Sequence, residues 1–301
     1  MSTSDTAAPA TILPPHPNPS QPAYRLPPGA CDAHCHVFGP GDRFPYSGKR
    51  TYTPPDAPAE RLRALHKLLG IARVVLVQAS AHGHDNSAML DAIAYAPDAY
   101  RGVAMVGAGV GDAELQALHK GGVRSVRFNF VQHLGGAPDL PTVQRLAERI
   151  KPLGWHLVLH LDAEDLVTYR DFLLGLPVPF VIDHMGRTMV KNGQAQRPFE
   201  LLLELMRSNE RAWVKVSGAE RISAALSAAE GGPYADAAPF ARRLIEAAPD
   251  RVLWGTDWPH PNVREMPDDG QLVDLLPRFT DDAALLQKLL VDNPTRLYWY
   301  D

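Results

Sequence analysis

The feature that most constrains the fold is a regular alternation of two patterns from residue 31 onward. Short runs of apolar and β-branched residues, typical of buried strands, alternate with longer stretches in which apolar residues recur at a helical period. Eight such units on one chain favour an α/β fold, a (β/α)8 barrel of the TIM type. We expect strands at 31–37, 72–78, 102–106, 123–128, 156–161, 180–183, 212–216 and 251–255, and helices at 59–69, 87–95, 112–120, 140–151, 163–174, 197–207, 235–247 and 281–291. A doubly wound open sheet is the alternative.

The first 30 residues differ from the rest because they contain eight prolines. Proline fixes φ and lacks an N–H, so this stretch is neither a helix nor a central strand. We therefore expect a Pro-rich N-terminal arm over 1–30 and one barrel domain over 31–301. The arm is either a disordered tail or a segment packed over the barrel bottom or a neighbouring subunit. Residues 39–58 form an unusually long loop after the first strand, at the barrel end that carries active sites.

Composition excludes several classes of function. The chain has 301 residues and a formal net charge of -4, which argues against a protein that holds nucleic acid by backbone charge. It has no run of about 18 apolar residues and no secretory signal, so we expect no membrane segment. The only cysteines, Cys31 and Cys35, cannot form a disulfide framework. A reducing cytoplasm is therefore the expected location.

The strongest chemical signal is a pair of histidines in the first strand. His34 and His36 are two residues apart, so both side chains point to the same face, which we expect to be the barrel mouth. Paired imidazoles there suit a divalent metal or an oxyanion held by N–H donors. The alternative is a pair of structural core histidines. Cys35 falls on the opposite face, where we expect it to pack.

Other polar residues follow later strands. Asp257 comes after the eighth strand, where a carboxylate can ligate a metal or act as a general base, although such an aspartate is usually a helix cap. His160 ends the fifth strand and His184 follows the sixth. His260 is expected to brace the loop after Asp257, and the alternative is that it is a site group. Four histidines and an aspartate at the same end of one barrel predict a site.

Cationic side chains gather at the same end. Arginines follow three strands, at Arg127, Arg187 and Arg221. Arginine stays charged and binds carboxylates through two N–H groups, so this pattern predicts a substrate with more than one anionic group. For each arginine the alternative is a surface ion pair. We expect Tyr52 and Ser80 to add hydrogen bonds and His82 to line the pocket or to lie in a loop.

These residues together resemble the amidohydrolase superfamily and, within it, the 2-pyrone-4,6-dicarboxylate lactonase group, with sulfomuconolactone hydrolases as neighbours. The resemblance runs from about Pro27 to Tyr300. It rests on Asp-Ala-His-Cys-His-Val-Phe-Gly-Pro at 32–40, Val-Gln-Ala-Ser at 77–80, Val-Arg-Phe-Asn-Phe at 126–130, Val-Ile-Asp-His-Met-Gly-Arg at 181–187 and Trp-Gly-Thr-Asp-Trp-Pro-His-Pro at 254–261.

The resemblance implies a barrel enzyme that opens a carboxylated lactone with water. Matching positions imply the catalytic residues His34, His36, His184 and Asp257. They also imply the substrate-binding residues Tyr52, Ser80, Arg127, Arg187 and Arg221. Asp257 would take a proton from water while the imidazoles, or a bound metal, polarise the lactone carbonyl.

Two positions depart from the lactonase pattern. His133 stands where the lactonases carry a second arginine, and His160 stands where they carry a tyrosine. We expect both to contact substrate. His160 also gives, with His34, His36 and Asp257, a complete ligand set for one divalent cation, and zinc suits three imidazoles and a carboxylate. The default substrate is 2-pyrone-4,6-dicarboxylate. The second choice is a muconolactone that carries a sulfonate or carboxylate, and the changes at His133 and His160 favour this second choice.

Two other functions stay open at the level of sequence. The same scaffold supports metal-dependent decarboxylation, although Tyr52, Arg127 and Arg187, which match the lactonases, argue against it. A non-catalytic small-anion binder would leave the His–Asp group without a purpose. The expected partner is a small anionic lactone, and the chain is a possible homo-oligomer.

Overall fold

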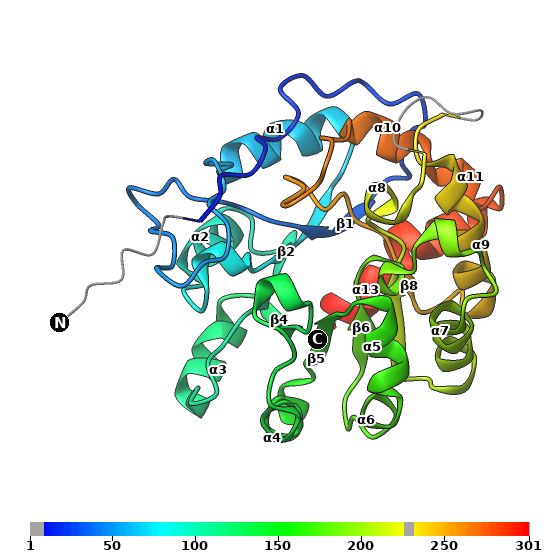
Figure 1. Cartoon of the computed structure of the whole chain (residues 1–301). Coiled ribbons are helices and arrows are strands. Elements are labelled where there is room, and N and C mark those ends of the chain that lie inside the picture. Colours follow the sequence, from blue (N-terminus) through cyan, green and yellow to red (C-terminus); the bar gives the residue numbers. More distant parts are fainter. Residues whose placement is uncertain (1–8, 226–231, 301) are drawn as a thin grey trace.

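The computed structural model describes residues 9–225 and 232–300. Eight strands form one sheet in the order β1 to β8, and each pairs in parallel with the next (Figure 1). The strands are β1 Cys31–Cys35, β2 Arg73–Val77, β3 Tyr100–Ala104, β4 Val123–Asn129, β5 His156–His160, β6 Phe180–Ile182, β7 Ala212–Lys215 and β8 Val252–Leu253. The expected (β/α)8 barrel is confirmed. The open doubly wound alternative is wrong, because the strand order follows the chain without reversal.

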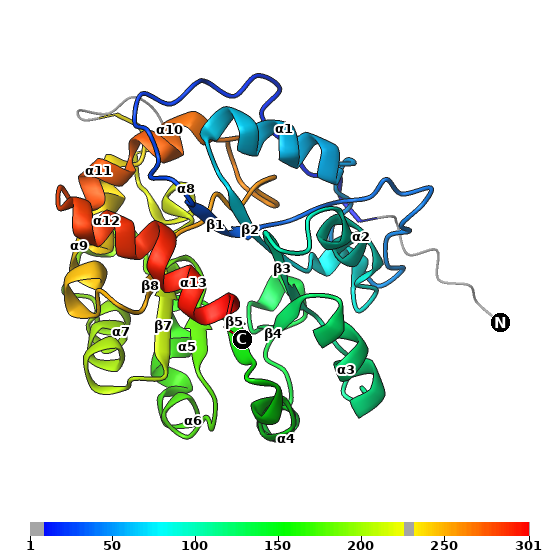
Figure 2. The ribbon, with the colours of Figure 1, turned by 180° about the vertical axis from the view of Figure 1, so that it is seen from behind.

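Helices surround the strands on the outside (Figure 2). They are α1 Ala59–Leu69, α2 Ser87–Tyr95, α3 Asp112–Lys120, α4 Leu140–Ile150, α5 Ala163–Thr168, α6 Arg170–Leu174, α7 Arg197–Ser208, α8 Ala219–Ile222, α9 Ala238–Ala247, α10 Asp269–Asp274, α11 Leu276–Phe279, α12 Ala283–Gln287 and α13 Asn293–Tyr298. The helix expected at 163–174 is divided at Tyr169. The helices α8, α10, α11 and α13 were not expected, because they are too short to show a helical period.

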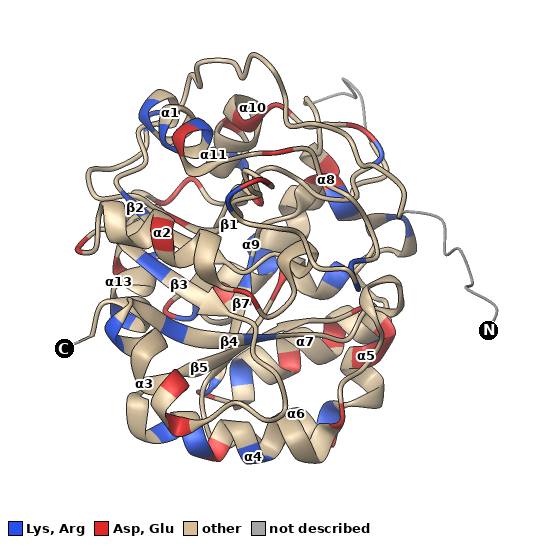
Figure 3. Ribbon diagram, turned by 90° about the vertical axis from the view of Figure 1, so that its left-hand side faces the viewer, with Lys and Arg blue, Asp and Glu red and all other residues tan. Residues whose placement is uncertain are grey.

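The core has two layers, which follow from the alternation of side chains along each strand. In β2, Val75 and Val77 belong to a cluster inside the barrel, whereas Val74 and Leu76 belong to the layer between sheet and helices. Lys and Arg are mixed with Asp and Glu over the outer helices (Figure 3). Among the described residues, no helix is both long and apolar enough to cross a membrane.

The barrel closes where β1 meets the segment after β8. The N–H of Ala33 donates to Trp254 O at 2.9 Å, Asp257 N–H donates to His34 O at 2.7 Å, and His36 N–H donates to Trp258 O at 2.7 Å. A Cβ on Gly255 would lie 2.4 Å from His34 N, so only glycine allows this approach. The closure places Asp257 directly beside the two histidines of the first strand.

The described part of the N-terminal segment crosses the outside of the barrel. Ser20 N–H donates to Asp268 Oδ1 at 2.9 Å, and Tyr24 N–H donates to Asp274 Oδ1 at 2.7 Å, both in or beside α10. Gln21 Nε2 donates to Leu68 O in α1 at 3.0 Å. The segment therefore joins the first and last parts of the barrel. The first eight residues of the expected arm lie outside the described residues, and the division into arm and barrel stays a prediction.

Candidate active site

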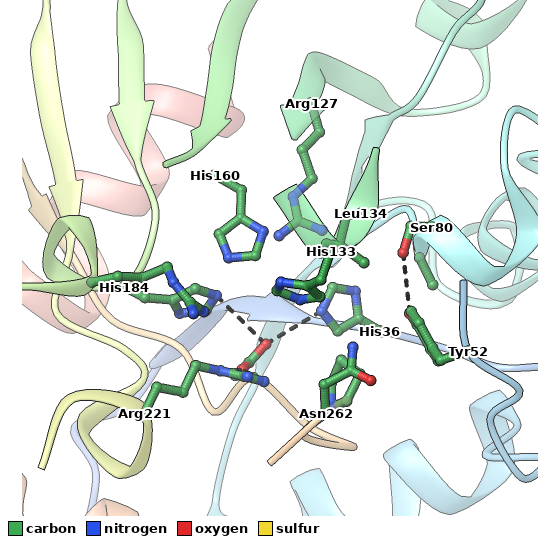
Figure 4. A pocket seen from close by; sticks show the side chains of 14 residues that line it. His36, Tyr52, Ser80, Arg127, His133, Leu134, His160, His184, Arg221 and Asn262 are labelled. Atoms are coloured by element: carbon green, nitrogen blue, oxygen red, sulfur yellow. Dashed lines mark hydrogen bonds and ion pairs between the residues drawn. The ribbon is translucent and has the colours of Figure 1, made fainter. Parts of the chain in front are cut away.

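A pocket opens at the carboxyl ends of the strands (Figure 4), with about 370 Å³ of empty space when the adjoining open solvent is included. Its lining consists of His36, Tyr52, Ala79, Ser80, Arg127, His133, Leu134, His160, His184, Arg187, Arg221, Asp257, Pro261 and Asn262. All of the sequence-predicted site residues except His34 and His82 are in this lining. Ala79, Leu134, Pro261 and Asn262 were not anticipated, because they carry no charged, imidazole or hydroxyl group that would mark them as site residues.

Asp257 lies at the floor of the pocket and its two oxygens have different surroundings. Oδ1 faces three imidazole nitrogens, the Nε2 atoms of His36 at 3.3 Å, His34 at 3.5 Å and His184 at 3.9 Å. Oδ2 accepts from Arg221 Nε at 2.6 Å and also contacts Arg221 Nη2. The backbone of Asp257 has φ of 67°, a conformation that aspartate tolerates better than most residues.

The charge state of Asp257 follows from these neighbours. Burial alone would raise the pKa of this carboxyl, but Arg221 and the imidazoles of His184, His36 and His34 hold the pKa well below its usual value. The side chain is therefore an ionised carboxylate with almost no contact with bulk solvent. A buried carboxylate of this kind can accept a proton from a water molecule at Oδ1.

His34 lies below the pocket floor, between Asp257 and two further buried charges. Its Nδ1 is 3.1 Å from Lys215 Nζ and 3.2 Å from Asp183 Oδ1. Burial and the charge of Lys215 lower the pKa of His34 to about 3, so its imidazole is neutral. Burial works against ionisation of Asp183, yet Lys215, His34 and Arg127 hold the pKa of its carboxyl well below the usual value.

Lys215 and Asp183 were not predicted as site residues. Each follows an apolar run directly, Ala-Trp-Val before Lys215 and Phe-Val-Ile before Asp183. A charge at the end of such a run is a usable signal, because buried charges need a partner. Here Lys215 Nζ lies 3.2 Å from Asp183 Oδ1, and both side chains are fully buried.

His184 comes from a tight turn after β6. His184, Met185 and Arg187 all have φ near 50°, and the following chain packs closely, since a Cβ on Gly218 would lie 2.9 Å from His184 Cβ. Its Nδ1 is 3.0 Å from Ser217 Oγ, which leaves Nε2 directed toward Asp257. Burial lowers the pKa of His184 well below its usual value, so this imidazole is also neutral.

Each arginine in the lining already contacts a carboxylate. Arg127 Nη2 lies 3.3 Å from Asp183 Oδ2, and Arg187 Nε donates to Asp162 Oδ1 at 2.7 Å. A guanidinium has five N–H donors, so such pairing leaves donors for a second anion. Arg127 Nε is buried and has no hydrogen-bond partner in the described part of the chain.

The remaining polar residues of the pocket lining include Ser80, Tyr52, His160 and His133. Ser80 Oγ donates to Tyr52 Oη at 3.2 Å at one side of the pocket (Figure 4). His160 Nδ1 lies 3.2 Å from Asn129 Oδ1, and burial lowers the pKa of His160 well below its usual value. His133 reaches the pocket from an exposed position.

His82 lies outside the lining. Its Nδ1–H donates to Pro45 O at 3.2 Å and its Nε2 accepts from Gly39 N–H at 3.1 Å. Both ring nitrogens therefore bind the backbone of the long first loop. His82 braces residues 39–45 in this structure.

Several side chains in the described residues could hold a metal ion. Ligand atoms of His34, His184 and Asp257 lie within 4.8 Å of one another, and those of Glu220, Asp257 and His260 form a second such group. A third group, Asp32, Cys35 and His66, lies outside the pocket lining. His36 and His160, which the sequence placed among the metal ligands, belong to none of the three groups.

Comparison with known proteins assigns the chain to a family. The family model described as Amidohydrolase matches residues 31–299, which includes every strand of the barrel. The chain belongs to the amidohydrolase family. This confirms the resemblance drawn from the His-x-His and Gly-Thr-Asp-Trp-Pro-His segments.

Individual relatives of this amidohydrolase carry more specific names. It is 52% identical over 286 residues to 2-pyrone-4,6-dicarboxylate hydrolase of Comamonas testosteroni, with 94% of each chain covered. It is 42% identical to 4-sulfomuconolactone hydrolase of Rhizobium radiobacter, with 92% of each chain covered. A crystal structure from Acinetobacter baumannii, described as a probable 2-pyrone-4,6-dicarboxylic acid hydrolase with citric acid bound, superposes with a TM-score of 0.77. That structure shares 26% identity and covers 90% of this chain and 100% of its own.

Proposed function

We propose that this amidohydrolase hydrolyses the ring ester of a lactone that carries more than one anionic group. The observation that carries the proposal is the surroundings of Asp257, an ionised buried carboxylate whose Oδ1 faces three imidazoles at the floor of an arginine-lined pocket. The names of the relatives, hydrolases of a pyrone dicarboxylate and of a sulfomuconolactone, support the same chemistry.

In the first step Asp257 acts as the general base. Its Oδ1 accepts a proton from water as the water oxygen attacks the lactone carbonyl carbon and the carbonyl π electrons move to oxygen. The resulting oxyanion needs donors that are fixed before the reaction. Nε2 of His184 lies beside Oδ1 and can supply such a donor, because its Nδ1 can accept from the hydroxyl of Ser217.

In the second step the ring opens. The tetrahedral intermediate re-forms its carbonyl and the bond to the ring oxygen breaks. Asp257, now protonated, returns the proton to that departing oxygen, so the carboxylate is ready for another cycle. The product has one new carboxylic acid and one new hydroxyl or its keto form, with no change in oxidation state.

The polar residues of the pocket lining bind the substrate. We propose that Arg127 and Arg187 bind the anionic groups of the substrate, because guanidinium groups bind carboxylate and sulfonate through paired N–H donors. Arg221, Tyr52 and Ser80 complete the binding set. His133 and His160, where the chain departs from the lactonase pattern, contact the same substrate. The default substrate is 2-pyrone-4,6-dicarboxylate, and a sulfo- or carboxymuconolactone is the second choice.

The group formed by Asp257 and the surrounding imidazoles also fits one divalent cation. His36 Nδ1–H donates to Val77 O at 2.8 Å, so a neutral His36 directs its Nε2 lone pair at Asp257. Nε2 of His34 is buried and has no hydrogen-bond partner in the described segments. We propose zinc, held by His34, His184 and Asp257 with His36 beside them. When bound it would supply a Lewis acid that lowers the pKa of water.

Metal content tests the cofactor separately from the reaction. Purified protein is expected to contain close to one zinc per chain, and chelation is expected to lower both its metal content and its melting temperature. His34→Gln should lose the metal. Active protein without metal would contradict the zinc proposal.

Ultraviolet absorbance of 2-pyrone-4,6-dicarboxylate tests the function itself. We expect loss of the pyrone absorbance on addition of the enzyme, with no release of CO2. A panel of sulfo- and carboxymuconolactones is assayed in parallel. Binding without turnover across that panel would contradict the proposal in favour of an anion binder, and release of CO2 would favour decarboxylation, which the names of the relatives support less.

We also propose that the enzyme works in the cytoplasm. Both cysteines, Cys31 and Cys35, are free and buried, which a reducing compartment maintains.

A further inference from the structure

A second buried charged group lies on the side of Asp257 away from the imidazoles. Glu220 Oε1 is 3.5 Å from Arg221 Nε and 3.7 Å from His260 Nδ1. His260 Nε2 is in turn 3.0 Å from Asp269 Oδ1 at the start of α10. His260 and Asp269 are fully buried and the side chain of Glu220 is 2% exposed. None of these three contacts takes part in the mechanism proposed above.

The group forms a row of alternating charges. Its members are, in order, Asp257, Arg221, Glu220, His260 and Asp269. Both Glu220 oxygens are buried without a hydrogen-bond partner in the described ranges, so the Glu220 carboxylate is balanced only by its cationic neighbours. Burial alone would lower the pKa of His260, but Asp269 and Glu220 raise it to about 10, which makes His260 cationic. An uncompensated charge in this position would be costly, so each member of the row depends on the next.

The row is not a vacant metal site. Ligand atoms of Glu220, Asp257 and His260 lie within 4.8 Å of one another, but Arg221 already contacts both carboxylates through Nε. The protein therefore supplies its own cation between Asp257 and Glu220. Its guanidinium directs both Nε and Nη2 at a single oxygen, Oδ2 of Asp257.

This geometry has a consequence for the base. Because Arg221 occupies Oδ2, the carboxylate plane of Asp257 is fixed and Oδ1 alone points at the imidazoles. Among the described residues Arg221 pairs with Glu220 and Asp257, so without the Glu220 charge the guanidinium is held by Asp257 alone and can pivot away from Oδ2. We propose that Glu220 and His260 are positioning residues that hold Arg221 on Oδ2, so that Oδ1 is the oxygen that takes the proton from water. The inference rests on the proposed lactone hydrolysis.

The variant Glu220→Gln in the full chain tests the inference, because it keeps the shape and removes the charge. We expect kcat to fall about 10- to 100-fold, the size of effect known for a slightly misplaced catalytic group, while KM changes less than about threefold. The charged variant Glu220→Asp should recover much of the lost kcat. Glu200→Gln, which breaks the outer ion pair of Glu200 with Arg243, is the matched control and should leave kcat and KM unchanged.

A double-mutant cycle shows whether Glu220 acts through Arg221. If it does, Glu220→Gln combined with Arg221→Lys should be no slower than Arg221→Lys alone. Additive losses would overturn the inference, as would an unchanged kcat in Glu220→Gln or a rise in KM with kcat retained. His260→Gln removes the charge of the next member of the row. It replaces Glu220→Gln as the test if Glu220→Gln does not fold.

A crystal structure of Glu220→Gln separates this inference from the proposed function. If the wild-type enzyme opens no lactone, the proposed function fails, and the position of Arg221 in the variant still decides the inference. Departure of the guanidinium from Asp257 Oδ2 supports it, and an unmoved guanidinium overturns it.

Discussion

At the scale of single residues, the site depends on how buried charges are paired. Asp257 is ionised because Arg221 and three imidazoles surround it, and His34 is neutral because it is buried beside Lys215. The reaction needs both states, a carboxylate that accepts a proton and imidazoles whose roles are set by their neighbours. Substitutions at these positions therefore have specific expected effects.

Asp257→Asn keeps the size of the side chain and removes the base. We expect turnover to fall by about 1,000-fold or more, because the amide cannot accept the proton of the attacking water. Circular dichroism and the melting temperature should show that the fold is retained. Turnover close to that of the wild type would exclude Asp257 as the base.

Arg127→Met tests anion binding from the side of the pocket nearest Asp183. We expect kcat/KM to fall at least about tenfold, the size of one lost charged hydrogen bond. The surface variant Arg145→Met, which breaks an exposed pair with Asp139, is the control. Equal kcat/KM in Arg127→Met and the control would place Arg127 outside substrate binding.

Lys215→Met removes the ammonium that balances Asp183 inside the barrel. Loss of one partner of a buried pair costs about 3–5 kcal/mol in the free energy of unfolding. Urea denaturation should show a loss of this size. Lys288→Met, which breaks the exposed pair with Asp250, should cost less than about 1 kcal/mol. Similar stability losses in both variants would show that Asp183 finds its balance elsewhere.

At the scale of elements, the strands could be predicted because each is a buried apolar run between polar segments. The site residues at strand ends were predictable for the same reason, since the barrel brings all those ends together. The short helix α8, which carries Arg221, leaves no periodic pattern in the sequence. The pairing of Lys215 with Asp183 and of Glu220 with His260 could not be predicted either, because the two members of each pair lie far apart in the chain.

Gly255→Ala is the test of the closure between β1 and β8. A Cβ there would meet the backbone nitrogen of His34, so the two edges must move apart. We expect lower stability and lower kcat together, because Asp257 and His34 are carried on those edges. Gly109→Ala, where a Cβ meets nothing within 4 Å, is the control. Full activity in Gly255→Ala would show that the closure does not position the base.

At the scale of the whole molecule, buried histidines make stability depend on pH. Burial lowers the pKa of His34 and of His156 to about 3, so below about pH 6.5 the unfolded chain binds protons that the folded chain does not. The free energy of unfolding should therefore fall from pH 6.5 toward pH 3, by about 1.4 kcal/mol per pH unit for each such histidine.

His260 has the opposite effect. Its pKa is raised to about 10, so its contribution to stability is complete below about pH 6.5 and is lost as the pH rises toward 10. Urea denaturation at several pH values should therefore give a maximum near neutrality. A flat profile between pH 7 and pH 4 would contradict the neutral state assigned to His34 and His156.

The closure between β1 and β8 also bears on how the protein is made. His34 and Asp257 come from the first and last strands, so the centre of the site requires contact between the two ends of the barrel. Contacts of such long sequence separation form slowly, since loop entropy is lost before they provide any stabilisation. A nascent chain has no base beside its imidazoles until the eighth strand has emerged from the ribosome. Activity should therefore appear in a single late step of synthesis and folding.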